Sequence, residues 1–144
     1  KIKRWMSPGD QFLVGFDRMK SVDVLVKAYN DSQGVTAGFN KNILNVINQH
    51  LQSNFDEADF EHHAFFNAAE LRIEMHLKAI KELQINTPFS VHPIVMKKGE
   101  TIHTENSHKF TEQKIMEFAT KSGLQFEKVF SDKDQYFSLA LFKI

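Results

Sequence analysis

The stretch LRIEMHLKA, residues 71–79, decides the fold class because its hydrophobicity alternates with a period of two. Apolar side chains occupy the odd positions, and charged or polar side chains occupy the even ones. Side chains of a β-strand point alternately to its two faces, whereas a helix would scatter this pattern around its circumference. The stretch therefore predicts a strand with one buried face. DFEHHAFFN, residues 59–67, is expected to pair with it as a hairpin that turns around residues 67–69.

Helical periodicity appears on both sides of this hairpin. SVDVLVKAY, residues 21–29, and NKNILNVINQHL, residues 40–51, carry apolar side chains at helical spacing and are separated by a polar loop with two glycines. FTEQKIMEFATKSG, residues 110–123, predicts a third helix, because Thr111 can cap its N-terminus and Gly123 can end it.

The remaining segments complete an α/β fold class. DQFLVGFD, residues 10–17, is apolar on both faces, which is typical of a buried parallel strand. GETIHTENSHKF, residues 99–110, reads as a strand, and INTPFSVHP, residues 85–93, reads as an edge or loop because of its two prolines. The last segment, residues 124–144, has two apolar runs around a polar turn and predicts an antiparallel hairpin.

Composition excludes several classes of function. The 144 residues carry a formal net charge of +0. The chain therefore lacks the excess of basic residues that would indicate a nucleic-acid partner. No apolar run reaches the roughly 18 residues that a membrane span needs, and no membrane partner is expected. Cys is absent, which excludes disulfides and cysteine-based metal sites or nucleophiles, and a cytoplasmic protein is expected. The chain begins at Lys1 without Met, and we interpret it as the C-terminal part of a longer protein.

The strand at residues 99–110 carries the polar groups best suited to binding a ligand. On a strand, Glu105 and Ser107 share a face and lie roughly 6.5–7 Å apart. A carboxylate accepts hydrogen bonds and a hydroxyl does either, so the pair can grip a small planar polar ligand at two points. The alternative is a solvated sheet face whose wet row comprises Thr101, His103, Glu105, Ser107 and Lys109. The residues alone leave both interpretations open.

Other candidate residues also have a purely structural alternative. Tyr29 lies on an apolar helical stripe, as a core residue or as a hydroxyl at the rim of a site. Met75 lies in the apolar row of its strand, where a core role is the commoner one. None of the seven histidines forms an i, i+4 pair with a glutamate base, so we expect no metal site. No motif indicates a catalytic nucleophile or a phosphate cradle.

In three blocks the sequence resembles the histidine-specific methyltransferase family. The blocks are AYNDSQGVTAGFNKNILNVIN (28–48), RIEMHL (72–77) and GETIHTENSHKF (99–110), in the family's order. The terminal GLQFEKVFSDKDQYFSLALF, residues 123–142, is similar to the family's last helix-to-hairpin region. Members are S-adenosylmethionine (SAM)-dependent enzymes, of which the L-histidine Nα-methyltransferases of ergothioneine biosynthesis are the best known. The resemblance implies the same activity on histidine or a related amino acid.

The resemblance also implies roles for individual residues. Glu105 and Ser107 stand where the family binds the imidazole of its substrate, as orienting groups rather than as a base. Tyr29 stands where the family holds the amino-acid backbone. Met75 stands in the wall of the substrate pocket, and Phe39 is expected to pack nearby.

The fold that the resemblance implies is the C-terminal part of a Rossmann-like methyltransferase. Residues 8–59 would supply a strand and helices of the Rossmann-like part, with residues 11–16 in a parallel sheet. Residues 60–110 would form a β-rich substrate-binding insertion. Residues 111–144 would supply the final helix and an antiparallel hairpin at the edge of a mixed sheet.

The cofactor implied is SAM, with its site mostly upstream of this chain. The isolated chain is therefore expected to bind SAM poorly and to be inactive. Its first strand would have an unpaired edge, which favours pairing with another copy or with the missing N-terminal half. The alternative is a non-catalytic ligand-binding or protein-interaction domain that retains the methyltransferase fold.

Overall fold

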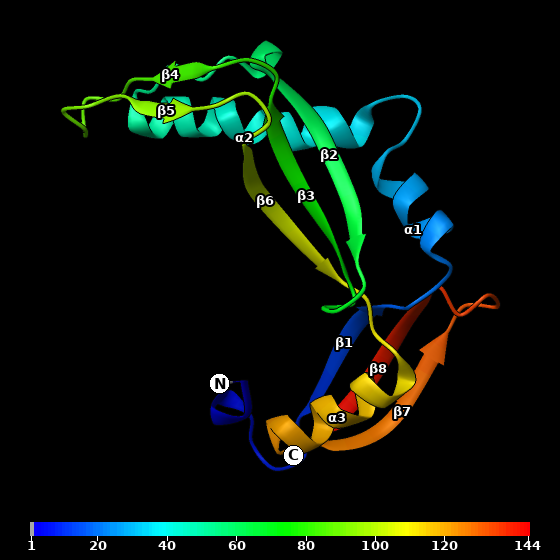
Figure 1. The fold of residues 1–144 in the computed structure, drawn as a ribbon. Helices are drawn as coiled ribbons and strands as arrows, with labels where there is room; N and C mark the ends of the chain where they lie inside the picture. Colours follow the sequence, from blue (N-terminus) through cyan, green and yellow to red (C-terminus); the bar gives the residue numbers. More distant parts are fainter. Residues whose placement is uncertain (1) are drawn as a thin grey trace. The chain divides into compact units, whose positions relative to one another are not determined.

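The computed structural model describes residues 2–144, which group into two compact units (Figure 1). The first unit comprises residues 2–21 together with His108–Ile144, and the second comprises Val22–Ser107. The chain thus leaves the first unit once, builds the second, and returns.

The second unit is built on a three-stranded sheet with helices packed against it (Figure 1). Its strands in spatial order are β2 (Phe60–Asn67), β3 (Arg72–Ala79) and β6 (Thr101–His108). β2 and β3 pair antiparallel from Phe60↔Ala79 to Asn67↔Arg72, which confirms the predicted hairpin.

The period-two pattern of β3 corresponds to one buried row of side chains. Ile73, Met75, Leu77 and Ala79 are each at most 2% exposed. Leu77 and Ala79 join a core cluster with Leu44 of the long helix described below. Burying such side chains contributes about 1.5–3 kcal/mol for each large one, so this row holds the sheet against the helix.

Two helices precede the sheet in the chain, α1 (Val22–Tyr29) and α2 (Val35–Leu51), and both pack against β2 and β3. The sequence pattern placed the start of α2 at residue 40, which is wrong. The helix begins at Val35 because the Asp31 carboxylate accepts hydrogen bonds from the N–H groups of Val35 and Thr36, at 2.9 and 2.8 Å. Gly34, which lies between Asp31 and the first residue of the helix, adopts a left-handed conformation with φ 71° that glycine allows without strain.

Short elements complete the second unit. A 3₁₀ turn, η2 (Glu57–Asp59), leads into β2, and β4 (Leu83–Ile85) pairs antiparallel with β5 (Ile94–Met96). The proline-containing segment between β4 and β5 is a loop, as predicted. Among residues 2–144, none of the helices is both long and apolar enough to cross a bilayer.

The first unit is an antiparallel sheet with one helix. After the 3₁₀ turn η1 (Ile2–Trp5), its elements are β1 (Gln11–Asp17), α3 (Glu112–Ser122), β7 (Gln125–Ser131) and β8 (Phe137–Lys143), with strand order β1-β8-β7. The predicted caps of α3 are confirmed: Thr111 accepts from the N–H of Lys114 at 3.2 Å, and Gly123 is left-handed. Ile115 and Ala119 of α3 pack with Phe16 and Phe142 in the core of this unit.

β1 differs from the expected parallel strand buried on both faces. It pairs antiparallel with β8, and the side chain row of Phe16 faces α3, whereas Leu13 is 53% exposed. The exposed face of this sheet is strongly apolar and carries Leu13, Phe130, Phe137 and Leu139. The predicted α/β class is confirmed in the sense that helices pack on antiparallel sheets. The Rossmann-like topology stays a prediction.

α1 and α2 group with β2–β6 in the second unit, since both helices pack against β2 and β3. The division into a Rossmann-like part at 8–59, a substrate-binding part at 60–110 and a final part at 111–144 stays a prediction.

Lys109 is a buried cation and not a member of a solvated strand row, which corrects one of the two interpretations of residues 101–109. Its side chain is 0% exposed, and its Nζ lies 2.7 Å from Asp17 Oδ2 within the first unit. Lys20 contacts the other carboxylate oxygen at 2.6 Å. Burial raises the pKa of Asp17, but the ammonium groups of Lys109 and Lys20 lower it by more, so its pKa lies below the ordinary value.

Replacing Lys109 with Met should lower the free energy of unfolding by about 2–3 kcal/mol. Breaking a fully buried ion pair typically costs 3–5 kcal/mol, and this pair is discounted because Asp17 is one-third exposed and keeps Lys20. Urea denaturation measures the change. Lys121→Met, which removes an exposed pair with Glu117, is the matched control and should cost no more than about 0.5 kcal/mol. Equal losses in the two variants would contradict the role of Lys109.

Replacing Asp31 with Ala should lower the midpoint of thermal unfolding at pH 7. Donation from the N–H groups of Thr36 and Val35 lowers the pKa of Asp31 from 3.8 to about 2. The ionised cap therefore stabilises the fold above about pH 4, and this contribution is lost as the pH falls toward 2. The difference between Asp31→Ala and the parent chain should narrow between pH 4 and pH 2.5. Asp23→Ala, in the first turn of α1, is the control, and a pH-independent difference would contradict the capping role.

Candidate substrate-binding site

Tyr29, the last residue of α1, is held from its backbone by β2. The Tyr29 carbonyl accepts a hydrogen bond from His62 Nε2 at 2.8 Å, and the next residue, Asn30, donates through Nδ2 to the Ala64 carbonyl at 3.1 Å. Both anchors lie on the same strand, so the end of α1 is fixed relative to the sheet.

The Tyr29 hydroxyl donates a hydrogen bond to the Ser107 hydroxyl across 2.6 Å. Tyr29 is half-buried on the apolar side of α1, and Ser107 is half-buried near the end of β6. The two residues are 78 positions apart in the sequence and are brought together by the fold, while their roles in binding a substrate stay a prediction. A hydroxyl group is both a donor and an acceptor of hydrogen bonds, so either oxygen of this pair has the chemistry to contact a polar ligand.

A buried amide, Asn40 of α2, connects Tyr29 to the middle of β6. Asn40 is 3% exposed and donates from Nδ2 to His62 Nδ1 at 2.9 Å and to the His76 carbonyl at 3.1 Å. Its Oδ1 lies 2.6 Å from the donating hydroxyl of Thr104. Because Nδ1 of His62 must accept from Asn40, Nε2 carries the proton that is donated to Tyr29.

The polar relay Thr104–Asn40–His62 was not predicted from the sequence. The signal that points to it is a polar residue, Asn40, one helical turn before the buried Leu44 on the sheet-facing side of α2. Only a polar partner on the sheet can satisfy an amide there, and that partner is not visible in the helix sequence.

Glu105 lines a groove together with Phe39. A shallow groove of about 160 Å³ is lined by Phe39, Asn40, Asn42, Ile43, Val46, Thr104 and Glu105. Phe39 is 67% exposed, so α2 presents an apolar surface to the groove that the core does not use. A carboxylate on one side and an apolar helix face on the other suit a small ring with a polar edge.

The prediction for Glu105 and Ser107 assumed that exposed and buried side chains alternate strictly along β6. The alternation holds from Thr101 to Thr104 and then breaks, because Glu105 and Asn106 are both exposed and Ser107 is half-buried. The shift brings Ser107 to the side of the helices, where Tyr29 meets it. Met75 is 2% exposed within the core row of β3, and its place in a pocket wall stays a prediction.

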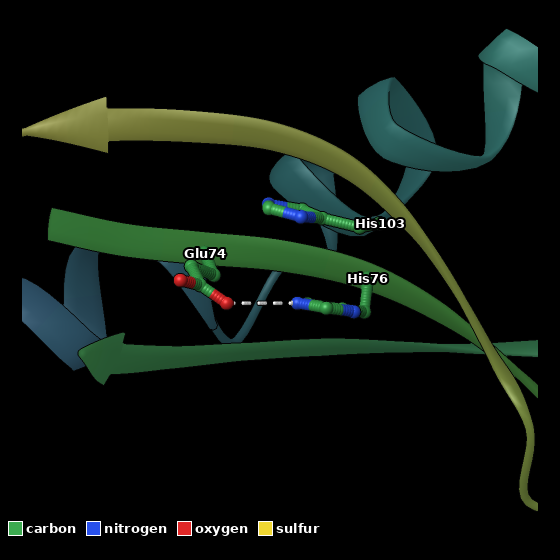
Figure 2. A group of neighbouring side chains, drawn as sticks. All are labelled: Glu74, His76 and His103. Carbon is green, nitrogen blue, oxygen red and sulfur yellow. Dashed lines mark hydrogen bonds and ion pairs between the residues drawn. The ribbon is translucent and has the colours of Figure 1, made fainter. Parts of the chain in front are cut away.

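The opposite face of the same sheet gathers a carboxylate and two imidazoles. Glu74 and His76 of β3 and His103 of β6 offer ligand atoms that all lie within 4.8 Å of one another (Figure 2). The Arg72 guanidinium, then the Asn67 amide, lower the pKa of Glu74 to about 2, so this carboxylate is ionised at neutral pH. The search for helical i, i+4 pairs missed this group because Glu74 and His76 are spaced for a strand.

Helices on one side of an antiparallel sheet define an α/β domain, and its hydroxyl and carboxylate groups on β6 meet the Asn40 amide of α2. The chain belongs to the family of histidine-specific, SAM-dependent methyltransferases, whose family model matches residues 1–144. It is 39% identical over 136 residues to a histidine N-alpha-methyltransferase of Mycobacterium tuberculosis, and 37% identical to that of Mycolicibacterium smegmatis. Each match covers 94% of this chain and 42% of the relative. The predicted family is thereby confirmed.

Neither the glycines nor the groove beside Glu105 forms a cradle that fits SAM. In a glycine-lined cofactor cradle, a Cβ added to a glycine would meet the atoms that surround the cofactor. A Cβ added at Gly9, Gly34, Gly38 or Gly99 would meet no other atom within 4 Å, so these positions face open space. At Gly15 the Phe137 ring already fills it, and at Gly123 the Lys3 side chain does. The groove beside Glu105, of about 160 Å³, is also smaller than the roughly 300–1,000 Å³ of cofactor pockets. We therefore place no cofactor atoms on these residues.

The Tyr29–Ser107 hydrogen bond should appear as a coupling energy in a double-mutant cycle. Tyr29→Phe and Ser107→Ala together should cost about 0.5–1.5 kcal/mol less than the sum of the single losses, because either change alone removes the bond. Urea denaturation of the four proteins gives the value. Ser90→Ala, in the loop between β4 and β5, replaces Ser107→Ala in the control cycle and should show additivity with Tyr29→Phe. Additivity in both cycles would contradict the bond.

Proposed function

We propose that this chain is the part of a SAM-dependent N-methyltransferase that grips the side-chain ring of histidine or a related amino acid. The chain spans 42% of the length of the relatives that it matches, and the activity is proposed for the whole protein. One observation carries the proposal. β6, the strand of the family's GETIHTENSHKF-like block, carries Glu105 into a groove beside Phe39 and carries Ser107 to within 2.6 Å of the Tyr29 hydroxyl.

Each of these side chains has a chemically distinct role in the proposal. The Glu105 carboxylate accepts a hydrogen bond from a ring N–H, and the Ser107 hydroxyl contacts the second ring nitrogen. Tyr29, anchored by His62 and Asn30, positions Ser107 and reaches toward the amino-acid backbone of the substrate. Phe39 packs against the flat apolar face of the ring.

The chain's own contribution is orientation of the substrate. The family's cofactor supplies a methyl group already activated by a positive charge on sulfur. Transfer then depends on holding the accepting nitrogen in line at about 3–3.5 Å from the carbon, which two-point recognition of the ring helps to set. Glu105 and Ser107 orient the ring and take no proton from the amine.

A non-catalytic binding or interaction domain is the second class of function. The printed names of both relatives are those of enzymes, which does not favour this alternative. The complete polypeptide, incubated with SAM and histidine, distinguishes the two by mass spectrometry. Methylated histidine supports the enzyme, and histidine binding by calorimetry without any methylated product supports the non-catalytic domain.

Replacing Glu105 with Ala in the complete enzyme should raise the KM for histidine by roughly ten- to a hundredfold, with kcat nearly unchanged. This range corresponds to about 1.5–3 kcal/mol for a hydrogen bond to a charged group. The preference for histidine over phenylalanine should also narrow, because an apolar ring no longer leaves a carboxylate unpaired. Initial rates with both amino acids measure these changes.

Glu82→Ala provides the matched control for this substitution. Glu82 is an exposed acid of the same unit and does not line the groove beside Glu105. Its replacement should leave KM and ring preference as they are. Unchanged kinetics in Glu105→Ala, or equal changes in both variants, would refute the role of Glu105.

A further inference from the structure

The face of the sheet opposite α2 holds a compact group of nitrogen and oxygen ligands. Glu74 and His76 are two residues apart on β3 and project from the same face, and His103 joins them from the neighbouring strand β6 (Figure 2). Their ligand atoms lie within 4.8 Å of one another. The side chains of Glu105, Ser107 and Tyr29 supply no ligand atom to this group, which adjoins the proposed substrate site through the Glu105 backbone carbonyl.

The two oxygens of Glu74 have different partners. Oε1 accepts from Asn67 Nδ2 at 2.8 Å and from Arg72 Nε at 2.8 Å. Oε2 faces His76 Nε2 at 3.2 Å. The carboxylate is therefore held in place through one oxygen while the other is directed at the imidazoles. Supporting contacts of this kind orient the ligands of metal sites.

Both imidazoles also have a supporting contact through one ring nitrogen. His76 Nδ1 lies 3.3 Å from the Thr101 hydroxyl, and His103 Nε2 lies 3.2 Å from the Glu105 carbonyl. A carbonyl can only accept, so His103 donates through Nε2, and in the neutral ring Nδ1 carries the lone pair. The Thr101 hydroxyl can either donate or accept, so the His76 ring can place its proton on Nε2, where it is donated to Glu74 Oε2 at 3.2 Å. In the other tautomer Nδ1 donates to Thr101, and Nε2 presents a lone pair beside the carboxylate to a metal ion.

We propose that Glu74, His76 and His103 form a binding site for a divalent transition-metal ion, with Zn²⁺ as the ion that best suits two imidazoles and one carboxylate. Zn²⁺ binds imidazole nitrogen and carboxylate oxygen at about 2.0–2.2 Å, which places tetrahedral ligands about 3.3 Å apart. This ligand set selects against Mg²⁺ and Ca²⁺, which prefer oxygen ligands alone. Three protein ligands leave a fourth position for water or a small anion.

Metal binding requires a small rearrangement, which the exposure of the side chains permits. The rings of His76 and His103 are stacked with centroids 4.5 Å apart and an interplanar angle of 7°. A metal ion lies in the plane of each ligating ring, so the two rings cannot both ligate while they remain parallel. His103 is exposed and can turn, whereas the His76 side chain is 13% exposed and stacks on Phe65 at 5.4 Å. The ion would thus replace a ring stack with coordination bonds that join β3 and β6.

Isothermal titration calorimetry with Zn²⁺ tests the proposal. The sample is the polypeptide that contains this chain, without an affinity tag and after treatment with a chelator. One Zn²⁺ should bind per chain, and His103→Gln should weaken binding at least tenfold, the lower limit of what the loss of a supporting contact causes at metal sites. His50→Gln, on an exposed histidine near the end of α2, is the matched control and should bind as the parent does. Equal affinity in His103→Gln and the parent chain would overturn the site.

Co²⁺ provides a second readout that does not depend on any variant. Substoichiometric Co²⁺ should shift the imidazole proton resonances of His76 and His103 before those of His50 and His92, and should give the visible absorption of a four- or five-coordinate ion. Shifts that begin at His50 or His92, or that spread evenly over the histidines, would show adventitious binding and overturn the proposal. Far-UV circular dichroism of His103→Gln verifies that a loss of binding is not a loss of the fold.

Discussion

The hydrogen-bonded amide of Asn40 is the constraint on which the arrangement of the second unit depends. Both its donor and acceptor sides are engaged, by His62 and the His76 carbonyl on one side and by Thr104 on the other. A buried amide left without partners costs about 1–3 kcal/mol, so a shifted packing of α2 on the sheet is disfavoured by more than lost apolar contact. The same bonds fix the His62 tautomer, which in turn holds the end of α1.

One sheet serves two chemically different faces because strand side chains alternate. β3 sends Met75 into the core with the helices and sends Glu74 and His76 to the opposite side. β6 is shared in the same way, since Ser107 meets Tyr29 on the helical side and His103 stacks on His76 on the other. A change on one face of these strands can therefore reach the other through the backbone that both use.

Much of the fold was predictable from residues 71–79 outward, because period-two and helical patterns are local properties of the chain. The hairpin of β2 and β3, the caps of α3 and the final hairpin follow from such patterns. The start of α2 was misplaced because the carboxylate of Asp31 caps it from four residues upstream, beyond the apolar stripe. The pairing of β1 with the antiparallel final hairpin agrees with the expected mixed sheet, whereas burial of both faces of β1 was wrong because Leu13 is exposed.

The family, the succession of elements and the identity of the polar groups on β6 can be read from the amino-acid sequence alone. Which of those groups meet depends on the tertiary fold, because a hydrogen bond across 78 positions and a shift in strand exposure leave no periodic pattern in the chain. The fold joined Ser107 to Tyr29, placed Glu105 beside Phe39 and buried Lys109 on Asp17. It also brought His103 to Glu74 and His76, since lateral strand pairing, unlike alternation along a strand, is a property of the folded sheet.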